Sequence, residues 1–144
     1  MDWKTTPVSK GITERKRVLV VEDDQDVNTL ICRYLAHRDF ECEGARSAQQ
    51  CMNHLNEPGA AEAPDLILID LELPDLDGVE LCARIRERAS TRSTPLLLMT
   101  GYQLANQLER VQAAGADAVL LKPFSPKELL AKIVEMTTPP SPAA

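Results

Sequence analysis

Short apolar runs alternate with stretches of helical periodicity along most of the chain. Five runs have the length and composition of strands: 17–21, 40–45, 66–70, 95–100 and 118–121. The run 17–21 has the composition of a buried strand, whereas 40–45 alternates and carries charge, which predicts an edge strand. After each run, apolar residues recur at spacings of three and four, which is typical of one face of a helix. Alternating strands and helices predict βαβ units, and therefore a parallel sheet with helices on both faces.

The helical periodicity also predicts which side chains face the core. These positions are Val27, Leu30, Ile31, Tyr34 and Leu35 in the first helix, Val79, Cys82 and Ile85 in the third, Leu104, Leu108 and Val111 in the fourth, and Leu129, Leu130, Ile133 and Val134 in the last. The fourth helix is predicted to end near Gly115. Five βα repeats of this size predict an α/β fold with a five-stranded parallel sheet in the flavodoxin-like order 2-1-3-4-5.

Two helix starts carry capping signals. Ser47 with Gln50 three residues on predicts a capping box for a helix that reaches about Leu55. Ser125 precedes Pro126 at the first helical position and Glu128 at the third, which predicts a second capping box.

Composition and charge fit one folded domain. The chain has 144 residues, 44% of them hydrophobic, which is enough for a core without disulfides. We expect a flexible segment at 1–16, a domain at 17–137 and a Pro-rich tail or linker start at 138–144. The formal charge of −6 argues against direct nucleic-acid binding, and no apolar stretch approaches a membrane span. The four cysteines form no C-x-x-C pair, so reduced thiols in a cytoplasmic protein are expected.

Polar residues follow four of the five predicted strands. In sheets of this order the ligand crevice lies at the carboxyl ends of the strands, beside the reversal in strand order, here between the first and third strands. The residues at these ends are Glu22, Asp23 and Asp24 after the first strand, Asp70 after the third, Thr100 after the fourth and Lys122 after the fifth.

This set of residues predicts phosphoryl-transfer chemistry. Crowded carboxylates repel one another unless a cation lies among them, and Mg²⁺ is the cation that also leaves room for a phosphoryl oxygen. Lys122 and Thr100 would neutralise phosphoryl oxygens during transfer, and Asp70 would be the nucleophile.

Each of these residues has a structural alternative when taken singly. Asp24 or Asp26 is predicted to be the N-cap of the first helix, and Asp75 and Asp77 are predicted to be turn residues. Lys122 alone would most often be a solvated surface lysine. The functional interpretation is favoured because four strand ends contribute the residue types that one reaction needs.

Four segments of the sequence resemble a known family. "VLVVEDD", "LILIDLELPDLDG", "LLLMTG" and "GADAVLLKPF" occur in this order, with 30 residues from Asp70 to Thr100 and 22 from Thr100 to Lys122. In this pattern the chain is similar to the receiver domains of bacterial two-component response regulators, over roughly residues 17–136.

The resemblance implies a phosphorylation switch rather than an enzyme with multiple turnover. Asp70 would accept a phosphoryl group from a phosphohistidine on a sensor histidine kinase or histidine phosphotransfer protein, or directly from a small phosphodonor, and would lose it slowly. Asp23 and Asp70 would ligate Mg²⁺, Glu22 would act mainly through a metal-bound water, and Glu72 would offer its backbone carbonyl.

The resemblance also implies how the phosphoryl group is held and reported. Lys122 would pair with it, and the bond from Lys122 to Pro123 is expected to be cis. Thr100 and the Gly101 amide would close over the phosphoryl oxygens and report to a surface made of the fourth helix, the fifth strand and the last helix. Tyr102 lies at a position that resembles those tuning phosphoryl lifetime, where its ring would shield the acyl phosphate from water.

One position departs from the family pattern. An aromatic residue usually stands three residues before the lysine, and here that residue is Val119. Its stiff β-branched side chain cannot act as the family's aromatic gate. We therefore expect output either through backbone shifts after the fourth strand, with or without Tyr102, or through one face presented mainly for phosphotransfer.

The sequence is compatible with several functional interpretations. The chain is either a stand-alone regulator that docks a downstream protein, as a monomer or weak homodimer, or the receiver segment of a hybrid kinase or multidomain regulator with a fused output domain. Two less favoured hypotheses are an interaction module that is never phosphorylated and an aspartate-nucleophile phosphatase.

Overall fold

The structure of the chain is a computed structural model, and it describes residues 15–57, 63–101 and 108–138. Its elements are β1 (Lys16–Val21), α2 (Gln25–Ala36), β2 (Phe40–Ala45), α3 (Ala48–Asn56), β3 (Leu66–Asp70), α4 (Gly78–Glu87), a 3-10 turn η1 (Ala89–Thr91), β4 (Leu96–Thr100), α5 (Leu108–Ala113), β5 (Ala118–Leu121) and α6 (Pro126–Thr137). The predicted positions Tyr102 and Leu104, and most of the two predicted terminal segments, lie outside the described residues.

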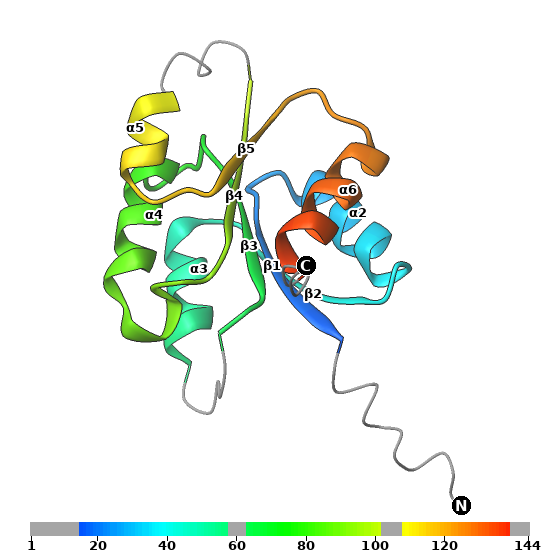
Figure 1. Cartoon of the computed structure of the whole chain (residues 1–144), viewed down its shortest axis with the longest axis horizontal. Helices are drawn as coiled ribbons and strands as arrows, with labels where there is room; N and C mark the ends of the chain where they lie inside the picture. The colour runs from blue at the N-terminus through cyan, green and yellow to red at the C-terminus, as the bar shows by residue number, and fades with distance from the viewer. Residues whose placement is uncertain (1–14, 58–62, 102–107, 139–144) are drawn as a thin grey trace, which may run out of the picture.

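The five strands form one parallel sheet (Figure 1). Their order is β2-β1-β3-β4-β5, so the predicted topology is confirmed. The reversal in order lies between β1 and β3, which are hydrogen-bonded neighbours with Val21 beside Ile69. β2 is an edge strand, as its alternating charged sequence predicts. This topology brings the carboxyl ends of β1 and β3 together.

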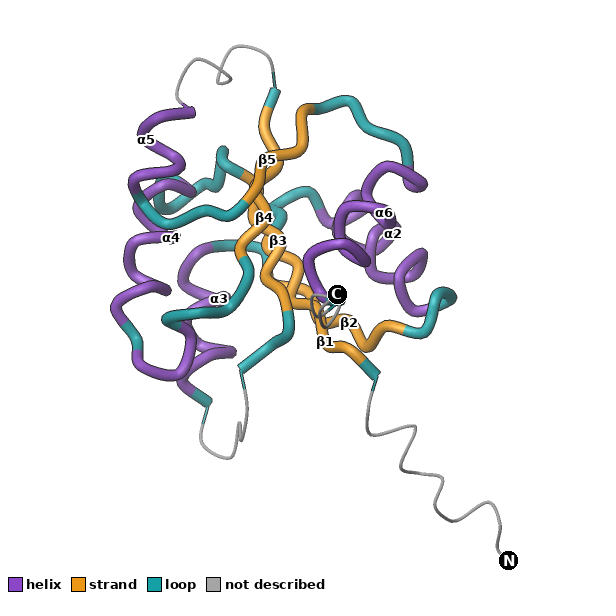
Figure 2. The backbone as a smooth tube through the Cα atoms, viewed as in Figure 1, coloured by secondary structure: helices purple, strands orange, loops and turns teal. Residues whose placement is uncertain are grey.

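Helices cover both faces of the sheet (Figure 2). Successive strand residues point to opposite faces, so each strand contributes to two cores. Leu19, Ile67 and Leu98 belong to the core beneath α3, α4 and α5. Val20 and Leu68 belong to the core beneath α2 and α6. Because β1, β3 and β4 are buried on both faces, each appears in the sequence as a continuous apolar run.

The buried face of α2 differs from the predicted one. Its buried residues are Asn28, Ile31 and Leu35, whereas Val27 and Leu30 are 37% and 65% exposed. The prediction was wrong at Val27 and Leu30 because the helix turns a polar residue, Asn28, toward the ends of the strands.

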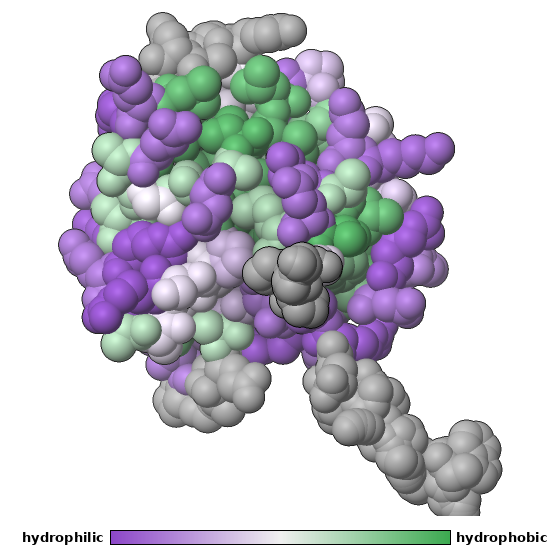
Figure 3. Space-filling view, in the orientation of Figure 1, coloured by the Kyte–Doolittle hydropathy of each residue, from purple (hydrophilic) through white to green (hydrophobic). Residues whose placement is uncertain are grey.

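The prediction of a buried side chain is also wrong at two other positions. Leu108 of α5 is 42% exposed and Val134 of α6 is 44% exposed. Apolar surface is visible over α5 and β5 and again beside α2 and α6 (Figure 3). The remaining faces follow the prediction, including Val79, Cys82 and Ile85 in α4.

One predicted cap is confirmed and one is corrected. Ser125 and Glu128 form a full capping box at the start of α6, with Pro126 in the first turn. At α3 the Ser47 hydroxyl accepts from the backbone amide of Gln50. The Gln50 side-chain oxygen, however, accepts from the backbone amide of Arg46 and not from that of Ser47. The return bond of a capping box is therefore missing at α3, because the Gln50 carboxamide reaches one residue beyond the cap.

The acidic residues near helix starts divide into local and long-range caps. Asp24 is the N-cap of α2 and Asp77 is the N-cap of α4. Asp75 lies in a bend between β3 and α4, and its carboxylate also accepts from the amides of Ala48 and Gln49 at 2.9 and 3.0 Å. Although burial opposes ionisation, these amide donors lower the pKa of Asp75 below its usual value. Asp75 therefore caps α3 from a different loop.

Candidate functional site

Three carboxylates meet at the carboxyl ends of β1 and β3. Glu22, Asp23 and Asp70 each offer an oxygen, and these oxygens all lie within 4.8 Å of one another. Glu22 and Asp23 directly follow β1, and Asp70 is the last residue of β3. The parallel pairing of these two strands brings residues nearly fifty positions apart into one acidic cluster.

Glu22 is the most buried member of the cluster, at 3% exposure. Its amide donates to the carbonyl of Ala45 at 2.9 Å, and its Oε2 accepts from the amide of Asp24 at 3.1 Å. Burial raises its pKa to about 7, with a further contribution from the charge of Asp70, against the opposing effects of the Asp24 amide and Lys122. Among the described residues, Oε1 of Glu22 is buried and accepts no hydrogen bond.

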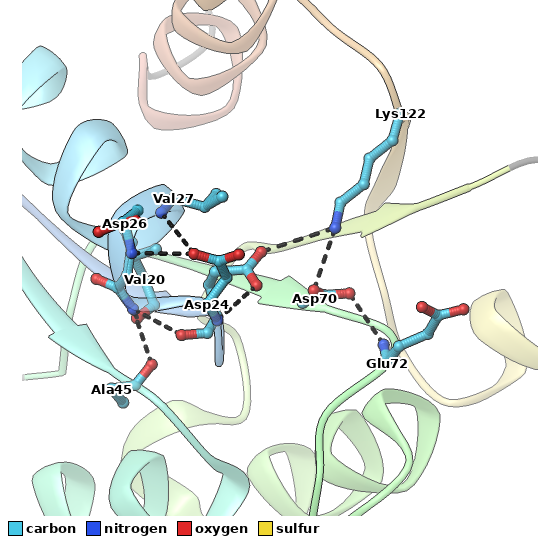
Figure 4. A network of polar contacts seen from close by, with 10 residues as sticks. Val20, Asp24, Asp26, Val27, Ala45, Asp70, Glu72 and Lys122 are labelled. Atoms are coloured by element: carbon cyan, nitrogen blue, oxygen red, sulfur yellow. Dashed lines mark hydrogen bonds and ion pairs between the residues drawn. The ribbon is translucent and has the colours of Figure 1, made fainter.

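Asp70 lies at the centre of the site and is 4% exposed. Its Oδ1 accepts from the amide of Glu72 at 2.9 Å, and its Oδ2 lies 3.1 Å from Nζ of Lys122 (Figure 4). The side chain of Glu72 points away from this group in Figure 4. The backbone of Glu72 therefore orients the Asp70 carboxylate, while its own carboxylate lies outside the contact.

Lys122 reaches the cluster from the position directly after β5, a strand two places away from β3 in the sheet. Its amide donates to the carbonyl of Thr100 at 2.7 Å, and its Nζ lies 3.7 Å from Oε1 of Glu22. Burial disfavours the charged ammonium, but the neighbouring charges of Asp70 and Glu22 outweigh it and raise the pKa of Lys122. The peptide bond between Lys122 and Pro123 is cis, as expected. The lysine is therefore held in its charged form against the cluster.

Thr100 and Gly101 lie at the end of the neighbouring strand, β4. Thr100 is buried, and its hydroxyl donates to the carbonyl of Gly101 at 3.3 Å. Asp70 pairs with Met99 in the sheet register, so Thr100 stands one residue beyond the strand position opposite Asp70. This places the threonine at the predicted edge, while its hydroxyl bonds within its own loop.

Asn28 is a site-supporting residue that sequence reasoning missed. It is buried in the first turn of α2, and its side-chain amide donates to the carbonyls of Val20, Glu22 and Ala45 at 3.3, 3.0 and 3.0 Å. These three carbonyls belong to the ends of β1 and β2. A polar residue among the apolar positions of an amphipathic helix was the available signal, because such a residue is buried only when it finds hydrogen-bond partners.

The cluster has the chemistry of a hard-cation site. It offers carboxylate oxygens from two strands and a buried oxygen, Oε1 of Glu22, that lacks a hydrogen-bond donor among the described residues. Magnesium prefers one or two carboxylates together with water. The residues present therefore fit a divalent ion coordinated by oxygen.

Sequence comparison identifies the family. A family model described as the response regulator receiver domain matches residues 18–134. The chain belongs to this family of receiver domains. Receiver domains accept phosphoryl groups rather than turning over a substrate, bind Mg²⁺ at an acidic pocket and interact with histidine kinases or phosphotransfer proteins. The family and fold predicted from the sequence are thus confirmed.

Curated relatives of this receiver domain are longer proteins. The phosphate regulon transcriptional regulatory protein PhoB of Escherichia coli is 35% identical over 129 residues, covering 90% of this chain and 55% of PhoB. The transcriptional regulatory protein ResD of Bacillus subtilis is 32% identical over 123 residues, covering 84% of this chain and 48% of ResD. The chain spans about half the length of the curated relatives it matches.

Solved structures agree with the receiver fold. A response regulator receiver domain protein from Methanospirillum hungatei is 30% identical, with a TM-score of 0.76 over 86% of this chain and 94% of its own. The chemotaxis response regulator CheY4 of Vibrio cholerae has a TM-score of 0.78 at 24% identity, over 85% of this chain and 98% of its own, and supports the fold alone. No helix in the described part of this receiver domain is long and apolar enough to cross a membrane.

Proposed function

We propose that Asp70 is the phosphoacceptor of this receiver domain. The observation that carries the proposal is the position of its carboxylate: buried at the end of the central strand, 3.1 Å from Nζ of Lys122, and in one cluster with Glu22 and Asp23. The Glu72 amide holds Oδ1 at 2.9 Å, which leaves Oδ2 on the side that faces Lys122. In the reaction, a carboxylate oxygen of Asp70 bonds to phosphorus as the bond from phosphorus to the donor's histidine nitrogen breaks.

The cation site is assigned to the same cluster. Asp23 and Asp70 would hold Mg²⁺ directly, Glu22 would act mainly through a metal-bound water, and the Glu72 carbonyl would complete the protein ligands. When bound, the ion supplies positive charge that stabilises the phosphoryl oxygens. Oε1 of Glu22 supports this assignment, because it is buried and accepts no hydrogen bond among the described residues, although Nζ of Lys122 lies 3.7 Å away.

Lys122, Thr100 and Gly101 hold the transferred group in this proposal. Lys122 exchanges part of its contact with Asp70 for a phosphoryl oxygen. The Thr100 hydroxyl now donates to the Gly101 carbonyl at 3.3 Å, a long bond between neutral groups. A phosphoryl oxygen is a stronger, charged acceptor, so phosphorylation draws this hydroxyl inward, with the Gly101 amide as a second donor.

The donor is proposed to be a sensor histidine kinase or a histidine phosphotransfer protein. A small phosphodonor replaces it in vitro, and the acyl phosphate is then lost slowly. The phosphorylated domain switches the binding of a downstream protein or of a fused output domain. We place the domain boundaries at 17 and 137 and the domain in the cytoplasm, where these donors present their phosphohistidine.

Intact mass after incubation with Mg²⁺ and acetyl phosphate tests this proposal. Wild type is expected to gain one phosphoryl group, and Asp70→Asn none. Asp26→Asn is the matched control because it removes an exposed carboxylate near the same site, and it should behave as wild type. A phosphorylated Asp70→Asn protein would refute the assignment. No gain in wild type would favour an interaction module, and continuous phosphate release over many turnovers would favour a phosphatase.

A further inference from the structure

Two of the four cysteines lie side by side on the face of the sheet covered by α2 and α6. Cys32 belongs to α2 and Cys42 to β2, and both thiols are free and half-buried. Their Sγ atoms are 2.9 Å apart. This separation is shorter than an ordinary non-bonded contact and within about 1 Å of a disulfide bond length. Only a small movement is needed to join the two sulfur atoms.

We propose that Cys32 and Cys42 are a redox-sensitive thiol pair, which a low-molecular-weight disulfide such as oxidised glutathione converts reversibly into an intramolecular disulfide. The fold already provides the contact, because α2 packs directly against β2 (Figure 1). The two residues are ten positions apart and are joined by the turn between these elements. The bond therefore closes across an existing interface.

The two thiols are not equivalent. The Cys42 thiol donates its hydrogen to the sulfur of Cys32. This hydrogen bond lowers the pKa of Cys32, against the opposing effect of burial. The same hydrogen bond, together with burial, raises the pKa of Cys42. Because the thiolate is the nucleophile in thiol chemistry, Cys32 attacks first.

The exchange proceeds in two balanced steps. The Cys32 thiolate attacks one sulfur of oxidised glutathione, whose disulfide bond breaks and releases one glutathione thiolate. The Cys42 thiol then loses its proton, and its sulfur attacks Cys32 in the mixed disulfide, which releases the second glutathione. The two protein thiols are oxidised, and one glutathione disulfide is reduced to two thiols.

The other two cysteines provide an internal contrast. Cys51 and Cys82 are fully buried in the core on the opposite face of the sheet. Burial raises the pKa of each to about 12. Neither thiol presents a thiolate to a solvent oxidant, so both are expected to stay reduced while Cys32 and Cys42 react.

The pair is connected to the acidic cluster through α2. The Cys32 thiol also donates to Oδ1 of Asn28 at 3.6 Å, one helical turn toward the N-terminus. Asn28 in turn holds the carbonyl of Glu22. Oxidation removes the sulfhydryl donor from Asn28 and bonds α2 covalently to the edge strand. The redox state therefore acts on α2, which begins directly after Glu22, Asp23 and Asp24.

Tryptic mapping of the whole chain after treatment with oxidised glutathione tests the proposal. Cleavage at Arg33 and Arg38 separates the two cysteines into peptides 18–33 and 39–46, whereas Cys51 and Cys82 share peptide 47–84. We expect 18–33 and 39–46 to appear joined, two thiols rather than four to react with iodoacetamide under denaturing conditions, and dithiothreitol to restore all four. Four reactive thiols, a disulfide that includes Cys51 or Cys82, or only a cross-link between chains would overturn the proposal.

Two serine variants test the order of attack. Cys42→Ser keeps a hydroxyl donor beside Cys32 and should stop at one glutathionyl group on Cys32. Cys32→Ser should react at Cys42 at least about tenfold more slowly, because no partner lowers the pKa of Cys42. Equal reactivity of the two variants would contradict Cys32 as the attacking thiol. The wild-type mapping decides the pairing even where a variant folds poorly.

Discussion

Nζ of Lys122 lies 3.1 Å from Oδ2 of Asp70, although Asp70 ends β3, Lys122 directly follows β5, and β4 lies between these two strands. The same ammonium lies 3.7 Å from Oε1 of Glu22. One positive charge thus faces two carboxylates, and its side chain remains 37% exposed. Part of the lysine is therefore free to follow a new anionic group at Asp70.

Lys122→Ala tests this relationship. Loss of a charged donor at the phosphoryl oxygens is expected to slow phosphorylation by acetyl phosphate about 100-fold or more. The measurement is the rate at which intact mass increases by one phosphoryl group in the presence of Mg²⁺. Lys127→Ala removes an exposed lysine of α6 and should keep the wild-type rate. An unchanged rate in Lys122→Ala would exclude Lys122 from the transfer step.

Glu22 makes the stability of the metal-free protein depend on pH. Its pKa is about 7 in the folded chain and 4.5 as the ordinary value, so the folded state holds the extra proton between these limits. Stability from this group is present below pH 4.5 and is lost as the pH rises through 7. Ionisation of Glu22 is expected to lower the free energy of unfolding by about 1–3 kcal/mol between pH 5 and pH 8.

Urea unfolding of Glu22→Gln with a chelator present measures this effect. The variant should be more stable than wild type at pH 8 and similar to it at pH 5, because glutamine keeps the shape without the charge. Saturating Mg²⁺ should stabilise wild type more than the variant at pH 8. Glu41→Gln changes an exposed carboxylate on β2 and serves as the control. Parallel pH profiles for wild type and Glu22→Gln would contradict the raised pKa.

Asn28→Ala is expected to destabilise the domain. The alanine removes the amide that serves three carbonyls, among them the carbonyl of Glu22. We expect a loss of about 2–3 kcal/mol in the free energy of unfolding, because buried acceptors lose their donor. Weaker Mg²⁺ binding, measured by calorimetry, should accompany it, because the loop that carries Glu22 and Asp23 loses its anchor. Thr29→Ala, on the exposed side of α2, should change neither quantity.

Val119 sets the expected route of the output signal. It is half-buried on β5 and packs against the core beneath α4 and α5. With beryllofluoride and Mg²⁺ bound, we expect amide chemical shifts to change in α5 and β5 by way of the loop after β4. Val119→Tyr should leave the extent of phosphorylation unchanged, because no described contact joins this residue to Asp70. Unaltered shifts in α5 and β5 would rule out signalling through this face.

Much of the site could be predicted because its residues follow strands. β1, β3 and β4 are buried on both faces, so each appears in the sequence as an apolar run that stops at a polar residue. In a parallel sheet such stops lie at one edge, which brings Glu22, Asp70 and Lys122 together without knowledge of any contact. The strand order and the family motifs could be recognised in the sequence for the same reason.

The sequence by itself determined the elements, the strand order and the acidic cluster, because these depend on local periodicity and on the position of polar residues after apolar runs. Only the tertiary structure decided which side of α2 is buried, that Asp75 caps α3 from another loop, and that Cys32 meets Cys42. Periodicity cannot separate Val27 from Asn28, because the choice depends on carbonyls from β1 and β2. The physical reason is that hydrogen bonds and thiol contacts between distant segments exist only once the sheet and its helices have packed.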